Sequence, residues 1–303
     1  MRAEACTWID IERPTQEDMD FLSEEYGFHK LTLEDVVSAR QRSKIERHAD
    51  HLFVILRFPV PAGDKPASPR SQVSFFIGKD YVVTVHEGDL PPIHKTWQAF
   101  RGDATRLQAG ASFLVYRLLD ELVDGVFPLL EALTGRLGEI EEAVFDDRVE
   151  VIRAVTDLRR SAHYMRTTIL PLKRVVAELS TELWGMDKSL VVYLKDVNDH
   201  LEKLVEKLDE IRETIEIYKD TDVLLSTAKT NRILALLTIA FTLAIPATVV
   251  GTFYGMNVNL PGGIEAGAWT FLGPYTTFLL IVAFSLVVPA IAMVWAFRHL
   301  KWI

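Results

Sequence analysis

The sequence predicts a membrane protein with an N-terminal α/β domain, a long helix and two C-terminal transmembrane helices. The distribution of charge is the first observation behind this prediction. The 303 residues contain 33 Lys and Arg and 42 Asp and Glu, but only Glu265, Arg298 and Lys301 follow residue 232. The second observation is that this nearly uncharged part contains two long apolar runs, residues 233–254 and 271–297. An average overall composition therefore hides a soluble part and a membrane part.

The acidic N-terminal part limits the classes of partner and site. Residues 1–232 hold 31 basic and 41 acidic side chains, which favours cationic partners, metal ions among them, and argues against nucleic acid. Cys6 is the only cysteine, so neither an intramolecular disulfide nor a cysteine zinc site is expected. The sequence has no Walker-type glycine loop and no catalytic constellation, so we expect neither an enzyme nor a resident cofactor.

Residues 1–110 are expected to form a cytoplasmic α/β domain. The run Thr15-Gln-Glu-Asp18 resembles a capping box, with Asp in place of the usual Glu, and Gly27 ends the helix that it begins. Gly78-Lys-Asp80 separates two β-rich runs and indicates a hairpin. The expected strands are residues 7–11, 51–60, 72–77 and 81–86, and a second short helix is expected over residues 31–39.

The pattern becomes helical after this domain. Apolar residues recur at three- and four-residue spacing from residue 111, and a second helix is expected from about 149 to 179, so residues 111–188 predict a helical hairpin. Trp184-Gly-Met-Asp187 interrupts the pattern, and no Pro or Gly then occurs before Pro246. We therefore expect one long helix, in which a stalk, 189–232, continues into the first transmembrane helix, 233–254.

Both apolar runs are long enough to cross a bilayer, which takes about 20 helical residues. Lys229 and Arg232 precede the first run, Arg298 and Lys301 follow the second, and the connecting residues 255–270 carry no Lys or Arg. The positive-inside rule then predicts an external loop and cytoplasmic termini, with residues 298–303 as a basic cytoplasmic tail. The expected location is the cell inner membrane.

One face of the long helix mixes polar and apolar side chains. With Asn231 as the reference, eight other positions fall within an arc of about 80° on a helical wheel. Threonine in a transmembrane helix often bonds to its own backbone or to a neighbouring helix, but polar residues that continue from Asp220 into the membrane favour an aqueous path. These pore-lining candidates, here called the polar stripe, are Asp220, Thr227, Asn231, Leu234, Thr238, Phe241, Ile245, Thr248 and Thr252. Two transmembrane helices cannot enclose such a path, so a pore requires several subunits.

The tetrapeptide Tyr254-Gly255-Met256-Asn257 follows the first transmembrane helix directly. By itself Gly-x-Asn is an ordinary turn sequence, but its context here is specific. The chain resembles the CorA family of divalent-cation channels, within the two-transmembrane GxN superfamily. The resemblance includes the segment from Asp220 to Asn231 and the basic terminus from Phe297 to Ile303, and it covers essentially the whole chain.

The resemblance implies a funnel-shaped homopentamer whose long helices line the pore. It implies a selectivity filter formed by Gly255, Met256 and Asn257, with the Asn257 amides of five subunits as the outer ring. It also implies regulatory ions between neighbouring cytoplasmic domains, held by Asp196 and Asp199 and by Asp64 from the adjoining domain. Where the family has Met-Pro-Glu-Leu, this chain has Leu260-Pro-Gly-Gly-Ile-Glu265, and Glu265 is the candidate for an external acidic ring.

These residue types suit Mg²⁺ as the transported and regulatory ion. Mg²⁺ dehydrates reluctantly, and a ring of neutral amide oxygens can hydrogen-bond to its hydration shell without holding the ion too tightly. Cys and His are the ligands suited to dedicated zinc transport. The polar stripe contains neither, so its residues favour Mg²⁺ over Zn²⁺. The membrane potential supplies about 4.6 kcal/mol per 100 mV for a divalent ion.

Three other interpretations remain open at this point. A Zn²⁺, Co²⁺ or Ni²⁺ transporter of the same fold, passive or proton-coupled, would have the same architecture. A membrane-anchored scaffold or receptor would need only the two transmembrane helices, not the polar stripe. His48 and His51 flank Asp50 and could ligate a metal, but a solvated turn before a strand is the favoured interpretation.

Overall fold

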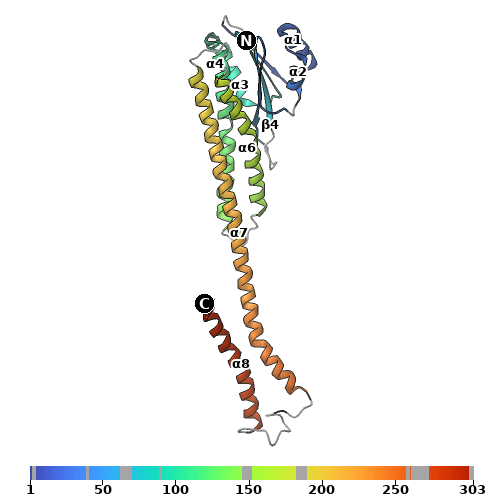
Figure 1. Cartoon of the computed structure of the whole chain (residues 1–303), viewed down its shortest axis with the longest axis vertical. Helices are drawn as coiled ribbons and strands as arrows, with labels where there is room; N and C mark the ends of the chain where they lie inside the picture. Colours follow the sequence, from blue (N-terminus) through green and yellow to red (C-terminus); the bar gives the residue numbers. More distant parts are fainter. Residues whose placement is uncertain are drawn as a thin grey trace. The chain divides into compact units, whose positions relative to one another are not determined.

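The computed structural model describes residues 1, 5–38, 41–61, 70–88, 90–144, 152–181, 190–256, 260 and 273–299. The chain forms two compact units, Met1–Asp222 and Val223–Ile303. The first contains a sheet and seven helices among its described residues, and the second contains the end of a long helix and one further helix (Figure 1). Each unit is described by itself below.

A five-stranded sheet forms the centre of the first unit. Its strand order is β1-β5-β4-β3-β2, with β1 parallel to β5 and the other pairs antiparallel. The hairpin predicted at Gly78-Lys-Asp80 is confirmed, since β4 and β5 pair on either side of it. β2 is a short edge strand that was not expected from the sequence. The strands are β1 (Thr7–Glu12), β2 (Lys44–Arg47), β3 (Leu52–Pro59), β4 (Arg70–Ile77) and β5 (Tyr81–His86).

Two short helices, α1 (Gln16–Tyr26) and α2 (Lys30–Val37), cover one face of the sheet. The predicted capping box at the start of α1 is confirmed: the Thr15 hydroxyl accepts from the Asp18 backbone N–H, and the Asp18 carboxylate accepts from the Thr15 N–H at 2.8 Å. Gly27 ends α1 with φ 67°, a conformation that glycine adopts without steric cost. Apolar residues of both helices, among them Leu22 and Val36, pack with Phe53, Phe76 and Val83 of the sheet.

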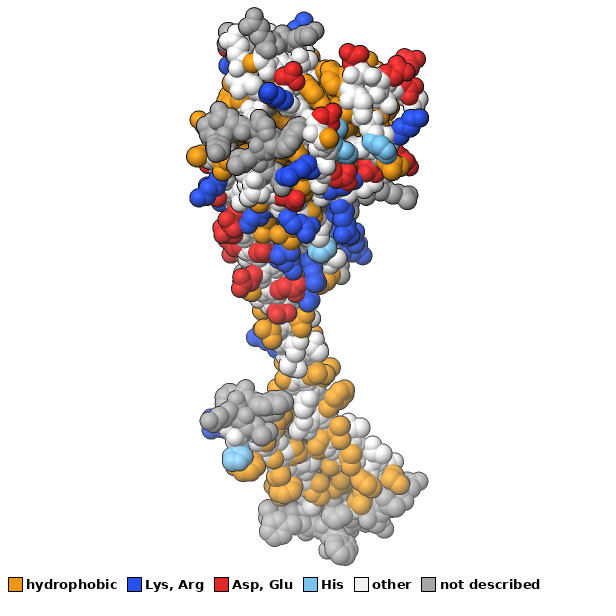
Figure 2. Space-filling view, turned by 45° about the horizontal axis from the view of Figure 1, so that its top comes forward, with side chains coloured by type: hydrophobic (Ala, Val, Ile, Leu, Met, Phe, Trp, Pro, Cys, Tyr) orange, Lys and Arg blue, Asp and Glu red, His pale blue; other side chains and the backbone are white. Residues whose placement is uncertain are grey.

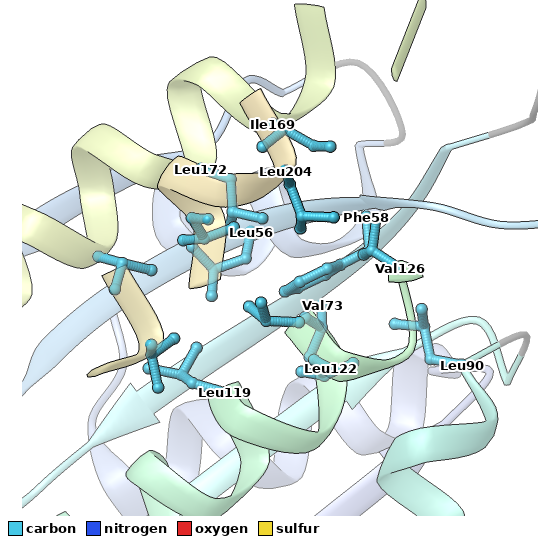
Figure 3. Close-up of a cluster of buried hydrophobic side chains, with 14 of the residues drawn as sticks. Leu56, Phe58, Val73, Leu90, Leu119, Leu122, Val126, Ile169, Leu172 and Leu204 are labelled. Atoms are coloured by element: carbon cyan, nitrogen blue, oxygen red, sulfur yellow. The ribbon is translucent and has the colours of Figure 1, made fainter. Parts of the chain in front are cut away.

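The opposite face of the sheet packs against a larger helical layer. Leu56, Phe58 and Val73 of the sheet lie in one cluster with Leu119 and Leu122 of α4 and Leu204 of α7 (Figure 3). The helices are α3 (Pro91–Gly102), a 3₁₀ turn η1 (Ala104–Ala109), α4 (Gly110–Asp124), α5 (Phe127–Val144), α6 (Ile152–Thr181) and α7 (Leu190–Tyr254). The first half of the predicted hairpin is therefore two helices rather than one, because Gly125 ends α4 and Pro128 fits the first turn of α5.

α6 and α7 run antiparallel and are joined by ion pairs at intervals of seven residues. The buried residues of α7 recur at alternating spacings of three and four: Leu194, Val197, Leu201, Leu204, Leu208, Ile211 and Ile215. α6 buries a wider side of its surface, because Ser161, Thr168 and Val175 are buried beside the residues at that spacing. Three ion pairs between the helices are also seven residues apart and fix the antiparallel register: Lys173–Glu202 (2.7 Å), Arg166–Asp209 (2.7 Å) and Arg159–Glu216 (3.3 Å).

The second unit contains the apolar end of α7 and α8 (Pro274–His299). Both helices are long and apolar enough to cross a membrane. Almost none of their apolar length is buried within the chain, 0% of the window in α7 and 6% in α8, and Figure 2 shows hydrophobic side chains across this surface. Tyr254 and Phe278 meet edge to face, with ring centroids 5.0 Å apart. A surface of this size and polarity requires lipid or further copies of the chain to cover it.

Candidate functional site

The structure places the polar stripe on one continuous helix. α7 passes through Pro246 without ending, so the wheel positions assumed from the sequence apply from Asp220 to Thr252. All nine stripe residues are exposed in the single chain. Within the second unit, the stripe from Thr227 to Thr252 is therefore a face that no described part of the chain covers.

The threonines of the stripe use their hydroxyl protons within the helix. The Oγ1 atoms of Thr227, Thr238, Thr248 and Thr252 donate to the carbonyl oxygens four residues earlier, at 2.8, 2.8, 2.9 and 2.8 Å. Each of these threonines therefore bonds to the backbone of its own helix, which is one of the two roles considered for them from the sequence. The lone pairs of each oxygen are not consumed by this bond. These hydroxyl oxygens can therefore accept hydrogen bonds from water but cannot easily donate them. A row of such acceptors suits a hydrated cation, whose water molecules present their protons outward.

The helix ends where the Gly-Met-Asn motif begins. α7 stops at Tyr254, and the Gly255 N–H donates to the carbonyls of Gly251 (3.0 Å) and Thr252 (3.1 Å). Met256 donates to the carbonyl of Phe253 at 3.2 Å and keeps an exposed side chain. Gly255 and Met256 are thus placed directly after the last helical turn. Asn257 lies outside the described residues, as do the two other candidates Glu265 and Asp64.

A second candidate site lies in the first unit, where Asp196 and His200 of α7 meet Asp120 of α4. One ligand atom from each of these three side chains lies within 4.8 Å of the others. Asp196 is exposed, and the other two side chains are half-buried. Carboxylates with one imidazole can coordinate a divalent cation. Among the described residues, no other group of three or more His, Cys, Asp or Glu side chains is close enough together to hold a metal ion.

The electrostatics around Asp120 are those of a crowded acidic site. Burial raises the pKa of Asp120, and the nearby Asp124 carboxylate raises it further. Arg117 offsets part of this effect through an ion pair to Asp120 at 2.8 Å. His200 Nδ1 is 3.5 Å from Asp124 Oδ1, without the geometry of a hydrogen bond. A bound cation would favour the ionised form of these carboxylates.

Only part of this cluster was expected from the sequence. The expected ligands were Asp196 and Asp199, but Asp199 is exposed and does not belong to the group of Asp120, Asp196 and His200. Asp196 and His200 are four residues apart on one helix, so their proximity was readable from the sequence. The contribution of Asp120 was not, because it depends on the packing of α4 against α7.

The expectation of a solvated turn at His48 and His51 is wrong for His51. Its side chain is buried, stacks on His48 with centroids 4.6 Å apart, and lies 4.8 Å from the ring of Phe28. His51 Nδ1 is 2.8 Å from Asp50 Oδ1. The cause is that His51 immediately precedes β3, at a position where α1 and the following loop cover the sheet. Its role here is packing.

Comparisons with known proteins agree with this architecture. The model of a family described as "CorA-like Mg2+ transporter protein" matches residues 3–299. YfjQ of Bacillus subtilis is 30% identical over 257 residues, which cover 84% of this chain and 79% of that protein. The cobalt/magnesium transport protein CorA of Thermotoga maritima is 28% identical over 303 residues, which cover 98% of this chain and 83% of that protein.

A solved structure shows the same fold. The complete structure of the CorA magnesium transporter from Methanocaldococcus jannaschii superposes with a TM-score of 0.78 at 23% identity. The match covers 98% of this chain and 91% of that chain. The α/β domain, the long helix and the two apolar C-terminal helices are therefore one established architecture.

Proposed function

Because the chain belongs to the CorA-like Mg²⁺ transporter family, as its match over residues 3–299 shows, we propose that it conducts divalent cations, Mg²⁺ first among them, across a membrane. The family and the two apolar helices α7 and α8 make it a membrane protein. Co²⁺ is the second candidate cargo, since the T. maritima relative is named for cobalt and magnesium. Influx is driven by the membrane potential, about 4.6 kcal/mol per 100 mV for a divalent ion.

The observation that carries this proposal is the uncovered polar stripe on α7. Four of its residues are threonines whose hydroxyl protons are already donated within the helix. In contact with lipid these side chains would bring no benefit, whereas several copies arranged around an axis would enclose them as an aqueous path. A homopentamer, the number that the resemblance implies, supplies one α7 from each of five subunits.

Selectivity in this proposal belongs to the end of α7. The Gly255 turn and Met256 lead to Asn257, whose amide oxygens form the outer ring. Neutral amide oxygens hydrogen-bond to the water of a hydrated Mg²⁺ and release it readily. Glu265 adds negative charge outside the ring, and both chain termini lie in the cytoplasm, with the chain in the inner membrane. No catalytic role is assigned to any of these residues.

Regulation is assigned to the acidic part of α7. The cluster of Asp120, Asp196 and His200 supports a regulatory cation site, to which Asp199 and Asp64 add ligands from neighbouring surfaces. A cation that binds only the closed arrangement shifts the equilibrium toward it, which produces negative feedback from the transported ion. His200 adds a borderline donor, so Co²⁺ and Ni²⁺ are expected to regulate as well.

Ion flux into proteoliposomes tests the proposed function. Purified protein is reconstituted, a potassium gradient with valinomycin sets the potential, and uptake of Mg²⁺, Co²⁺, Ni²⁺ and Zn²⁺ is compared with and without a proton gradient. We expect Mg²⁺ uptake that follows the potential and does not depend on the proton gradient. Uptake of Zn²⁺ alone, or uptake only with a proton gradient, would support the zinc-transporter alternative instead.

A further inference from the structure

Two arginines lie side by side in the sheet of the first unit, and neither is among the residues assigned above. Arg57 is on β3 and Arg70 on β4, where Pro59 pairs with Arg70 and Arg57 with Gln72. Arg57 and Arg70 are thus diagonal neighbours on one face of the sheet, within reach of long side chains. Both line a small cavity of about 60 Å³, together with Ser71, Gln72 and Glu87.

Neither arginine has a carboxylate partner among the described residues. Arg57 Nη1 donates to the carbonyl of Gln41 at 3.3 Å. Arg70 Nη2 donates to Thr167 Oγ1 at 2.8 Å, and its guanidinium lies 4.2 Å from the ring centroid of Tyr164. The Nε atoms of both arginines are buried and make no hydrogen bond. Each guanidinium has five N–H donors, so contacts with the described residues use only a small part of this donor capacity.

No carboxylate among the described residues forms an ion pair with either arginine of this pair. Burial lowers the pKa of Arg57, and the positive charge of Arg70 lowers it further. Glu87 lies on the rim of the cavity with an exposed side chain, and it forms no ion pair with either arginine. Arg117, Arg159 and Arg166 in the same unit all have carboxylate partners. Two half-buried like charges with free donors are expensive unless an anion lies between them.

We propose that Arg57 and Arg70 bind a phosphate-type oxyanion at this cavity. A guanidinium offers two parallel N–H groups that match two oxygens of a phosphate, and two guanidiniums can hold one dianion from two sides. The cavity admits a group of the size of one phosphate, which can be free inorganic phosphate or the terminal phosphate of a nucleotide whose remainder lies outside. The site is separate from the cation path and from the Asp120–Asp196–His200 cluster.

Isothermal titration of the full-length protein in detergent, in a buffer free of phosphate and divalent cations, tests this proposal. Sodium phosphate and metal-free ATP are titrated separately into the wild type, Arg57→Gln, Arg70→Gln and the control Arg160→Gln. Arg160 is an exposed arginine on α6. We expect saturable binding to the wild type and the control, and affinity about tenfold or more lower in each cavity variant, since each removes charge-assisted hydrogen bonds.

The outcomes separate the two sources of the anion and can overturn the proposal. Binding of phosphate identifies the free ion as sufficient, and binding of ATP alone identifies a nucleotide. Absence of saturable binding of both probes to the wild type, or equal affinity in the wild type and Arg57→Gln, would disprove the site. If Arg57→Gln or Arg70→Gln fails to fold, the lysine variant at the same position, Arg57→Lys or Arg70→Lys, replaces it. Lysine keeps the charge but loses the bidentate geometry, and each lysine variant should bind more weakly than the wild type.

Discussion

At the scale of single residues, Asn257 carries the strongest functional expectation. Asn257→Ala should leave assembly intact and remove most of the Mg²⁺ flux, because the change deletes the amide oxygens that we propose contact the hydration shell. The measurement is Mg²⁺ uptake into proteoliposomes, with size-exclusion chromatography to verify assembly. Asn259→Ala, two residues beyond the motif, is the matched control. Near-normal uptake by a correctly assembled Asn257→Ala protein would refute the selectivity ring.

Asp120 and Asp196 are expected to act together on the response to Mg²⁺. Replacing either residue by Asn removes a charged ligand. The Mg²⁺ concentration that protects the chain from limited proteolysis should therefore rise about tenfold or more relative to the wild type. The double change Asp196→Asn with Asp199→Asn should reduce protection further if Asp199 contributes through a neighbouring copy. Asp157→Asn, an exposed aspartate on α6, is the control. Protection of Asp120→Asn at wild-type Mg²⁺ concentrations would exclude Asp120 from the site.

His51 predicts a pH dependence of stability. Burial lowers the pKa of His51 in the folded protein, and the hydrogen bond to Asp50 only partly opposes this. Below about pH 6.5 the unfolded chain therefore binds a proton at His51 that the folded chain does not, so stability falls as the pH falls. The melting temperature of the wild type should drop more steeply between about pH 7.5 and 5.5 than that of His51→Gln. His163→Gln, an exposed histidine on α6, should follow the wild type; identical slopes for His51→Gln would refute the prediction.

At the scale of elements, the buried side of α7 predicts where the first unit is most sensitive to substitution. Leu204 is fully buried in the core between the sheet and the helices, and Leu204→Ala should lower the free energy of unfolding by about 2–5 kcal/mol, because it removes apolar contact and leaves a cavity. Val192→Ala, at an exposed position of the same helix, should cost far less. Thermal unfolding of both variants measures the difference, and equal melting temperatures would contradict the described packing.

Elements encoded by adjacent residues were predictable, and those that depend on distant residues were not. The Thr15–Asp18 capping box, the hairpin at Gly78-Lys-Asp80 and the uninterrupted α7 all follow from local sequence. β2 was missed because Lys44-Ile-Glu-Arg47 has one apolar residue and becomes a strand by pairing with β3. The meeting of Asp120 with Asp196 depends on helix packing, which no local pattern reports.

At the scale of the whole molecule, the exposed stripe and the uncovered apolar helices predict self-association. Two transmembrane helices per chain cannot enclose a path, so several chains must assemble. The detergent-solubilised protein should have the mass of five chains, the number that the family resemblance implies. Native mass spectrometry measures this directly, and the Thr15→Ala variant, altered only in the α1 cap, serves as a control for the assembly assay. A protein that transports ions as a monomer or dimer would contradict a pore lined by one α7 from each subunit.

The edges of the sheet bear on how copies of the chain can meet. Unpaired strand edges invite aggregation, and proteins counter this with short or charged edge strands. β2, at one edge, has only four residues, and Lys44 pairs there with Asp35 and Glu46 at 2.5 and 2.6 Å. On β1, at the other edge, the Trp8 N–H donates to the Met1 carbonyl, and the Met1 amino group donates to the Trp8 carbonyl. Sheet extension from one chain to the next is thereby discouraged at both sides, so association is left to helical surfaces, and a concentrated preparation should resist fibril formation.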